Sequence, residues 1–184
     1  MDNTANYLQD FLQTNQFVHA GNLELCEDEK IVFSPLLKKS NGHCVYIWCA
    51  KKQDQIVPLY IGKAKNGVNI RMNQHIGGFR EGNSGSNSGR RIKRILIELF
   101  KVNWTIEVYT RDSLNSIVIS QLTEGFFDFN LRNADDFIYP NIPLYSLEEE
   151  LLIRFFEENF PHLRLINGIK EKYVTDLISK LIIL

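Results

Sequence analysis

The sequence predicts an α+β domain in which three strands are interleaved with helices. Two runs rich in β-branched and aromatic residues, "HCVYIWCA" and "QIVPLYIG", flank the polar turn "KKQDQ", which predicts a β-hairpin. Several other segments carry apolar residues at helical spacing. The chain has 184 residues, of which 44% are hydrophobic and 23% are charged, as is typical of one globular domain.

The first 40 residues predict a helical arm, because "NTANYLQDFLQTN" spaces its apolar residues as a helix does. In the hairpin that follows, successive side chains point to opposite faces of each strand. The first strand therefore divides into two sets: Val45, Ile47 and Cys49 on one face, and Cys44, Tyr46 and Trp48 on the other. Pro58 in the second strand indicates a sheet edge or a bulge, because proline has no amide hydrogen to donate.

Two helices and a third strand are expected next. "GVNIRMNQHI" predicts a short helix whose buried stripe is Val68, Met72 and Ile76. A Gly/Ser/Asn-rich loop, "GGFREGNSGSNSG", separates it from "RRIKRILIELF", a second helix with its basic residues outward. The inward residues of the second helix are Ile92, Ile95, Leu96 and Leu99. "NWTIEVYT" then alternates as a strand.

The last third of the chain is less regular. "SLNSIVISQL" is ambiguous, and we favour a helix, while the aromatic and irregular residues 123–145 indicate an insertion. "SLEEELLIRFFEENF" predicts a helix, and "IKEKYVTDLISKLIIL" predicts another. The expected organisation is a helical arm over residues 1–40, a main domain over 41–170 and a C-terminal helix over 171–184 packed on that domain.

The charge is nearly balanced overall, at −1, but it is unevenly distributed. Residues 60–101 contain nine Lys/Arg and two Asp/Glu, whereas residues 124–161 contain two Lys/Arg and nine Asp/Glu. Such blocks predict one face that attracts anions, although two solvated surfaces of opposite sign explain them equally well.

Several classes of protein are excluded by the composition. Three cysteines fit neither a disulfide framework nor a four-ligand zinc site, so we expect free thiols. The N-terminus lacks the basic start and apolar centre of a signal peptide, and the longest apolar runs are too short to span a bilayer. We therefore expect a soluble, cytoplasmic protein without a membrane partner.

Four polar residues are expected to lie close together after the hairpin. Tyr46 and Tyr60 belong to neighbouring strands, and Arg71 and His75 share one face of the next helix. Each also has a purely structural explanation, because strand tyrosines usually pack and an Arg/His pair is usually solvated. Spacing alone thus supports a basic domain with an anion site and identifies no reaction.

Two later polar residues also allow structural explanations. "SLEE" places Ser146 three residues before Glu149, which is a capping-box pattern in which Glu149 binds a backbone amide. Asn167 precedes a glycine, and Asn-Gly is a strong turn signal.

Five short motifs, taken in order, resemble those of the GIY-YIG nuclease superfamily: "CVY", "LYIG", "GKAKNGVNIRMNQH", "EELLI" and "LIN". The resemblance covers residues 42–167, except for the insertion, and implies a small three-stranded antiparallel sheet flanked by helices. Cys44 replaces the usual glycine of the first motif. The gap from Glu149 to Asn167 is longer than usual, so Asn159 competes for the asparagine position.

The resemblance implies a role for each motif residue. Tyr46 would be the general base and Tyr60 would orient the water or the phosphate, with His75 and Lys63 helping Tyr46 to ionise. Arg71 would bind the phosphate, and Asn167 would anchor the phosphate or the helix of Glu149. Glu149 would hold one Mg²⁺, which Mn²⁺ can replace. The expected DNA-binding residues are Lys65, Arg80, Arg90, Arg91, Lys93 and Arg94.

The resemblance therefore predicts a Mg²⁺-dependent DNA endonuclease of the restriction type, acting as a homodimer through the N-terminal arm or the insertion. A structure-specific DNA repair or recombination nuclease is the first alternative. The others are a nucleic-acid-binding module without catalysis and a protein-interaction domain that uses the acidic, aromatic region 123–160.

Overall fold

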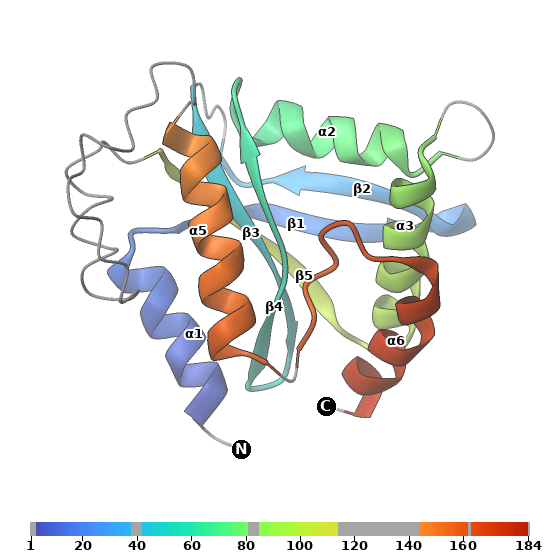
Figure 1. Cartoon of the computed structure of the whole chain (residues 1–184). Helices are drawn as coiled ribbons and strands as arrows, with labels where there is room; N and C mark the ends of the chain where they lie inside the picture. The colour runs from blue at the N-terminus through green and yellow to red at the C-terminus, as the bar shows by residue number, and fades with distance from the viewer. Residues whose placement is uncertain (1–2, 38–41, 81–84, 114–143, 162, 184) are drawn as a thin grey trace.

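The computed structural model describes residues 3–37, 42–80, 85–113, 144–161 and 163–183. A central antiparallel sheet lies between two helical layers, with α1 and α5 on one face and α2, α3 and α6 on the other (Figure 1). The order of elements is α1 (Asn3–Thr14), β1 (Val18–Cys26), η1 (Glu27–Glu29), β2 (Lys30–Pro35), β3 (Cys44–Lys52), β4 (Gln55–Ala64), α2 (Val68–Gly78), α3 (Asn87–Lys101), β5 (Thr105–Asp112), α5 (Leu144–Asn159), η4 (Glu171–Tyr173) and α6 (Val174–Ile183). The expected helix in "SLNSIVISQL" and nearly all of the expected insertion lie outside the described residues.

The sheet has five strands in the order β2-β1-β5-β3-β4, so the prediction of three strands was wrong. Residues 1–40 supply the two further strands as well as α1, and β1 pairs with β5. A register shift between His19 and Gly21 interrupts the alternation of β1. Gly21 has a φ of +152°, and a Cβ there would lie 2.3 Å from the Ser34 carbonyl oxygen. This bulge obscures the two-residue period that would have marked the strand.

The predicted hairpin is confirmed as β3 and β4, and Pro58 lies in the edge strand β4 as expected. Trp48 pairs with Tyr60 and Cys49 with Pro58, so Leu59 is the extra residue of a bulge. Because directly opposite residues project from the same face of a sheet, this register places Tyr60 beside Trp48. It also places Gly62 opposite Tyr46.

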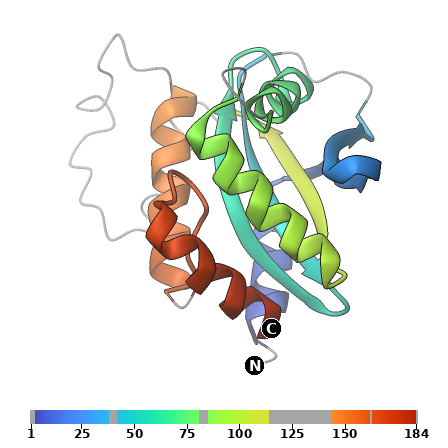
Figure 2. The same cartoon turned by 90° about the vertical axis from the view of Figure 1, so that its right-hand side faces the viewer.

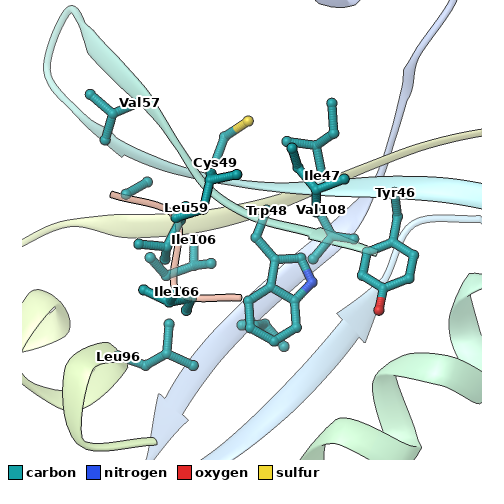
Figure 3. Packing of buried hydrophobic residues seen from close by; sticks show 14 of the residues in the cluster. Tyr46, Ile47, Trp48, Cys49, Val57, Leu59, Leu96, Ile106, Val108 and Ile166 are labelled. Carbon is teal, nitrogen blue, oxygen red and sulfur yellow. The ribbon is translucent and has the colours of Figure 1, made fainter. Parts of the chain in front are cut away.

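The core fills both faces of β3, where every residue from Cys44 to Ala50 is buried. Ile47 and Cys49 point to one side and Tyr46 and Trp48 to the other, as the alternation predicted (Figure 3). On the first side, α1 and α5 meet through stacked rings of Phe11 and Phe155, 4.8 Å apart.

On the other side of the sheet, the four predicted inward residues of α3 are all buried. The C-terminal helix α6 lies against α3 (Figure 2). The three cysteines are free thiols, as expected. Within the described ranges, every helix is too short or too polar to cross a membrane.

A buried ion pair fixes α5 to the sheet. Glu148 and Arg111 approach to 2.6 Å with side chains only 3% and 5% exposed, and the Ser113 hydroxyl donates a second hydrogen bond to Glu148. Arg111 comes from β5, so the contact determines where the first turns of α5 lie relative to β3 and β4.

Candidate active site

The hydroxyl of Tyr46 is the centre of the predicted cluster. It forms a 2.6 Å hydrogen bond with Nε2 of His75. The Tyr46 ring is stacked with that of Tyr60 at 6.1 Å, and the charge of Arg71 offsets part of the rise in pKa that burial causes at Tyr46. Strand β4 ends at Ala64 and α2 begins at Val68, so the first turns of the helix lie beside the hairpin. The structure thus brings together the four side chains for which the sequence suggested a common site.

Gly62 makes room for this arrangement. The Tyr46 ring lies over it so closely that a Cβ at Gly62 would be 2.2 Å from the phenol oxygen and 2.3 Å from Cζ. Contacts below about 3.0 Å are essentially never made by a real Cβ. The glycine of the "YIG" motif is therefore required by the position of Tyr46.

Gly62→Ala is expected to destabilise the protein by about 1–3 kcal/mol, because the new methyl group overpacks the Tyr46 ring. It should also displace the Tyr46 hydroxyl from His75. Urea denaturation measures the first effect. Gly77→Ala is the matched control, since a Cβ at Gly77 meets no atom of the described residues within 4 Å. An equal stability of the two variants would contradict the packing argument.

A pocket of about 260 Å³ opens beside the cluster. Tyr60, Arg71 and His75 line it, and Tyr46 lies behind them with no exposed surface. Its other lining residues are Gln74, Gly78, Phe79, Ser86, Ser88, Gly89, Ile92 and Gly168. A phosphate in the pocket would therefore meet Arg71 and Tyr60 directly, and Tyr46 only through them.

Burial keeps the cluster neutral apart from Arg71. It raises the pKa of Tyr46 well above its usual value, and the charges of Tyr60 and Glu149 raise it further while Arg71 lowers it. Burial is the main cause that lowers the pKa of His75 to about 3, and the charge of Arg71 is the second. At neutral pH the imidazole is therefore uncharged, and one of its two ring nitrogens can accept a proton.

The stability of the protein should depend on His75 in acid. A histidine in the unfolded chain titrates near ~6.5, so between this value and about 3 the unfolded state binds more protons than the folded state. The free energy of unfolding consequently rises with pH across this window and is lost as the pH falls. We expect His75→Gln to flatten this dependence, by up to about 1.4 kcal/mol per pH unit. Urea denaturation at several pH values measures the slope, and equal slopes would contradict the expectation.

Glu149 forms a 2.8 Å ion pair with Lys63 of β4. In the sheet, Lys63 pairs with Val45 and so projects from the α5 face of the hairpin, opposite to Tyr46. The described residues that line the pocket do not include Glu149. The charge of Glu149 raises the pKa of Tyr46 and of Tyr60, so it is close enough to act on both phenols. Helix α5 already includes Leu144 and Tyr145, which places Ser146 inside the helix. The capping-box interpretation of Glu149 was therefore wrong, because Ser146 is not the N-cap.

A divalent ion at Glu149 would have one protein ligand. Within the described ranges, no three His, Cys, Asp or Glu side chains are grouped to hold a metal. Mg²⁺ typically keeps several waters and uses one or two carboxylates plus phosphate oxygens. Glu149 is partly exposed, and its Oε2 already accepts a cation, the Lys63 ammonium. These properties fit a single Mg²⁺ held by one carboxylate and the substrate.

Of the two asparagines, Asn167 lies beside the site. Its side-chain amide binds both backbone groups of Ile61, accepting from the amide at 3.0 Å and donating to the carbonyl at 2.5 Å. It thereby fixes the segment after α5 to the edge of β4. Asn159 instead caps the end of α5 through the Phe155 carbonyl. Asn167 is thus a positioning residue for β4, and its hydrogen bonds among the described residues go to Ile61 and not to Glu149.

Three of the six predicted DNA-binding residues form a second surface along α3. Arg90, Lys93 and Arg94 line a groove of about 500 Å³, together with Lys101 and two carboxylates. Phe79 lines both this groove and the smaller pocket, so the two are neighbours. Lys65 and Arg80 are exposed and Arg91 is half-buried, and none of the three lines the groove.

Two contributors were missed in the sequence. The Trp48 ring lies 4.7 Å from that of Tyr60 and 5.0 Å from that of His75, so it supports both. The alternation of β3 already placed Trp48 on the face of Tyr46 and was the available signal. Glu148 had no such signal, because it is one of three consecutive glutamates.

Comparison with known proteins supports the fold. No protein-family model matches the chain. No curated protein matches it. Among solved structures, the chain is similar to a mutant of EndoII from bacteriophage T4, with 20% sequence identity, a TM-score of 0.52, and coverage of 81% of this chain and 94% of that chain. EndoII is a GIY-YIG nuclease, so the likeness shows the fold that the order of the motifs predicted.

Proposed function

The chain has the GIY-YIG fold, and from this premise we propose that it is a Mg²⁺-dependent endonuclease that hydrolyses phosphodiester bonds in DNA. The observation that carries the proposal is the cluster around the Tyr46 hydroxyl, with Arg71, His75 and Tyr60 lining a pocket. Glu149 lies beside the same hairpin, paired with Lys63 of β4. A general acid–base group, a fixed guanidinium and a carboxylate for a cation are the parts that phosphodiester hydrolysis needs.

Arg71 is the phosphate-binding group in this proposal. It lines the pocket, and its Nε is buried without a hydrogen-bond partner among the described residues. A non-bridging phosphate oxygen would satisfy that donor and pair with the positive charge. The same charge stabilises the phosphoryl group as it gains negative charge in the transition state.

The proton of the attacking water passes through the phenols. Tyr60 lines the pocket and its ring is stacked with that of Tyr46, which is hydrogen-bonded to His75. As the water oxygen attacks phosphorus, its proton moves to Tyr60, that of Tyr60 to Tyr46, and that of Tyr46 to His75. Tyr46 thus acts as the base, and it receives the proton of the water through Tyr60. Phosphate binding favours this transfer, because it offsets the Arg71 charge that contributes to the low pKa of His75.

Glu149 would hold the cation, which would supply charge stabilisation for the leaving 3′ oxygen. Neutralising Glu149 also matters for the phenols, because its charge raises the pKa of both Tyr46 and Tyr60. Both phenols would therefore become easier to ionise once a cation bound at Glu149 offsets this charge.

The groove along α3 would bind the DNA backbone next to the scissile phosphate. Lys93→Ala is expected to lower the slope of log K against log salt by about 0.9, the value for one lost phosphate contact on duplex DNA. Fluorescence anisotropy with labelled DNA in EDTA measures binding without cleavage. Lys180→Ala, which removes an exposed lysine of α6, is the control and should leave the slope unchanged. Equal slopes for all three proteins would contradict a role for the groove.

The biological role that we favour is that of a restriction enzyme. One site of this kind cuts one strand, so cleavage of a duplex calls for a dimer, two successive events or a branched substrate, and we favour the dimer. A homodimer with one site for each strand meets this requirement.

Incubation of supercoiled plasmid with the protein and Mg²⁺ tests the proposal. We expect discrete linear fragments or nicks with Mg²⁺, and none with EDTA. Retardation of the DNA without cleavage would show a binding module instead and overturn the proposal. Analytical ultracentrifugation with and without DNA tests the dimer separately.

A further inference from the structure

Lys63 and Glu149 form an ion pair at the site proposed for the metal. The ammonium lies 2.8 Å from Oε2, and the side chains of Lys63 and Glu149 are 38% and 21% exposed. Lys63 projects from β4 directly after Gly62, and Glu149 projects from the first turns of α5. The carboxylate that would bind a divalent ion therefore already has a positively charged partner.

The Lys63 ammonium is paired with Oε2 of Glu149. An ammonium and a divalent ion on the same small carboxylate would repel each other strongly at such short range. A partly exposed ion pair is weak, since water solvates and screens both partners. A divalent ion can therefore displace the ammonium, which has a flexible stem and access to solvent.

We infer that Lys63 is an internal counter-ion of Glu149 that holds the cation position in the metal-free protein and leaves it when a divalent ion binds. The inference rests on the proposed function, because it takes Glu149 as the metal ligand. It adds that Lys63 competes with the metal and weakens its binding in the absence of DNA. Once displaced, the ammonium is available to the phosphate that the substrate brings into the site.

Binding of Mn²⁺ alone to the whole chain, without DNA, tests this competition. The electron paramagnetic resonance signal of the free ion reports how much is bound. We expect Lys63→Met to tighten Mn²⁺ binding about fivefold, which corresponds to the upper range for a partly exposed ion pair. Lys63→Arg keeps the positive charge and should bind Mn²⁺ about as weakly as the wild type.

Lys65→Met is the matched control, because it removes the same charge from an exposed side chain two residues along the chain. Its Mn²⁺ affinity should stay close to that of the wild type. Thermal unfolding followed by circular dichroism verifies that each variant is folded. The inference is overturned if Lys63→Met binds no tighter than the wild type, or if Lys65→Met tightens binding equally, which would reduce the effect to net charge.

Glu149→Gln separates this inference from the metal assignment. If it binds Mn²⁺ as the wild type does, Glu149 is not the ligand, and the assignment and the inference fail together. If it loses Mn²⁺ binding while Lys63→Met gains none, the assignment stands and only the exchange of cations is wrong. A loss in Glu149→Gln together with a gain in Lys63→Met supports both.

Discussion

Glu149→Gln is expected to reduce DNA cleavage by about a thousandfold or more while the protein stays folded. The amide keeps the shape of the side chain and removes the charge that would hold the cation. Within the described residues, Glu149 is not part of a helix cap, and its charged partner is Lys63, in a partly exposed ion pair. Loss of such a pair changes stability by about 1 kcal/mol or less. Single-turnover cleavage in Mg²⁺ and urea denaturation measure the two effects.

Glu150→Gln is the control for this experiment. Glu150 is the next residue, its side chain is 61% exposed, and it pairs with Arg154 one helical turn away. The substitution removes the same charge from the same helix and should leave cleavage unchanged. If both variants cleave DNA equally well, Glu149 has no special role, and the proposed metal site is wrong.

Glu148→Gln should have the largest effect on stability, a loss of about 3–5 kcal/mol in the free energy of unfolding. Glu148 and Arg111 are almost fully buried, so removing one charge leaves the other without a partner in a poorly solvated position. Because the pair fixes α5 to β5, we also expect cleavage to fall through displacement of the neighbouring Glu149. Urea denaturation measures the first effect.

The double variant Arg111→Met/Glu148→Leu tests the physical reason. Replacing both charges by apolar side chains of similar size removes the desolvated ions as well as their attraction, so it should recover most of the lost stability. Asp176→Asn breaks the exposed pair with Lys180 and should cost less than about 1 kcal/mol. If Glu148→Gln were as stable as the wild type, the buried pair would not be important for stability.

The hairpin, its two faces and the helices α2, α3 and α5 were predictable from the sequence. Each depends on neighbours within a few residues: a polar turn, an alternation of two, or an apolar period near 3.6. The order of motifs from Tyr46 to Glu149 came instead from the resemblance to the GIY-YIG superfamily, and not from these local rules. They failed for β1 and β2, because a bulge at Gly21 breaks the alternation and because β1 pairs with β5, which lies far along the chain.

The sequence by itself determined which residue types are present and in what order: the two tyrosines, the Arg71/His75 pair and a run of glutamates. The tertiary structure alone decided what each of them does. Glu148 and Glu149 are chemically identical neighbours, yet one is buried against Arg111 and the other is partly exposed and paired with Lys63. Their environments differ because successive residues of a helix point about 100° apart, and only the packing of α5 on the sheet assigns a partner to each direction.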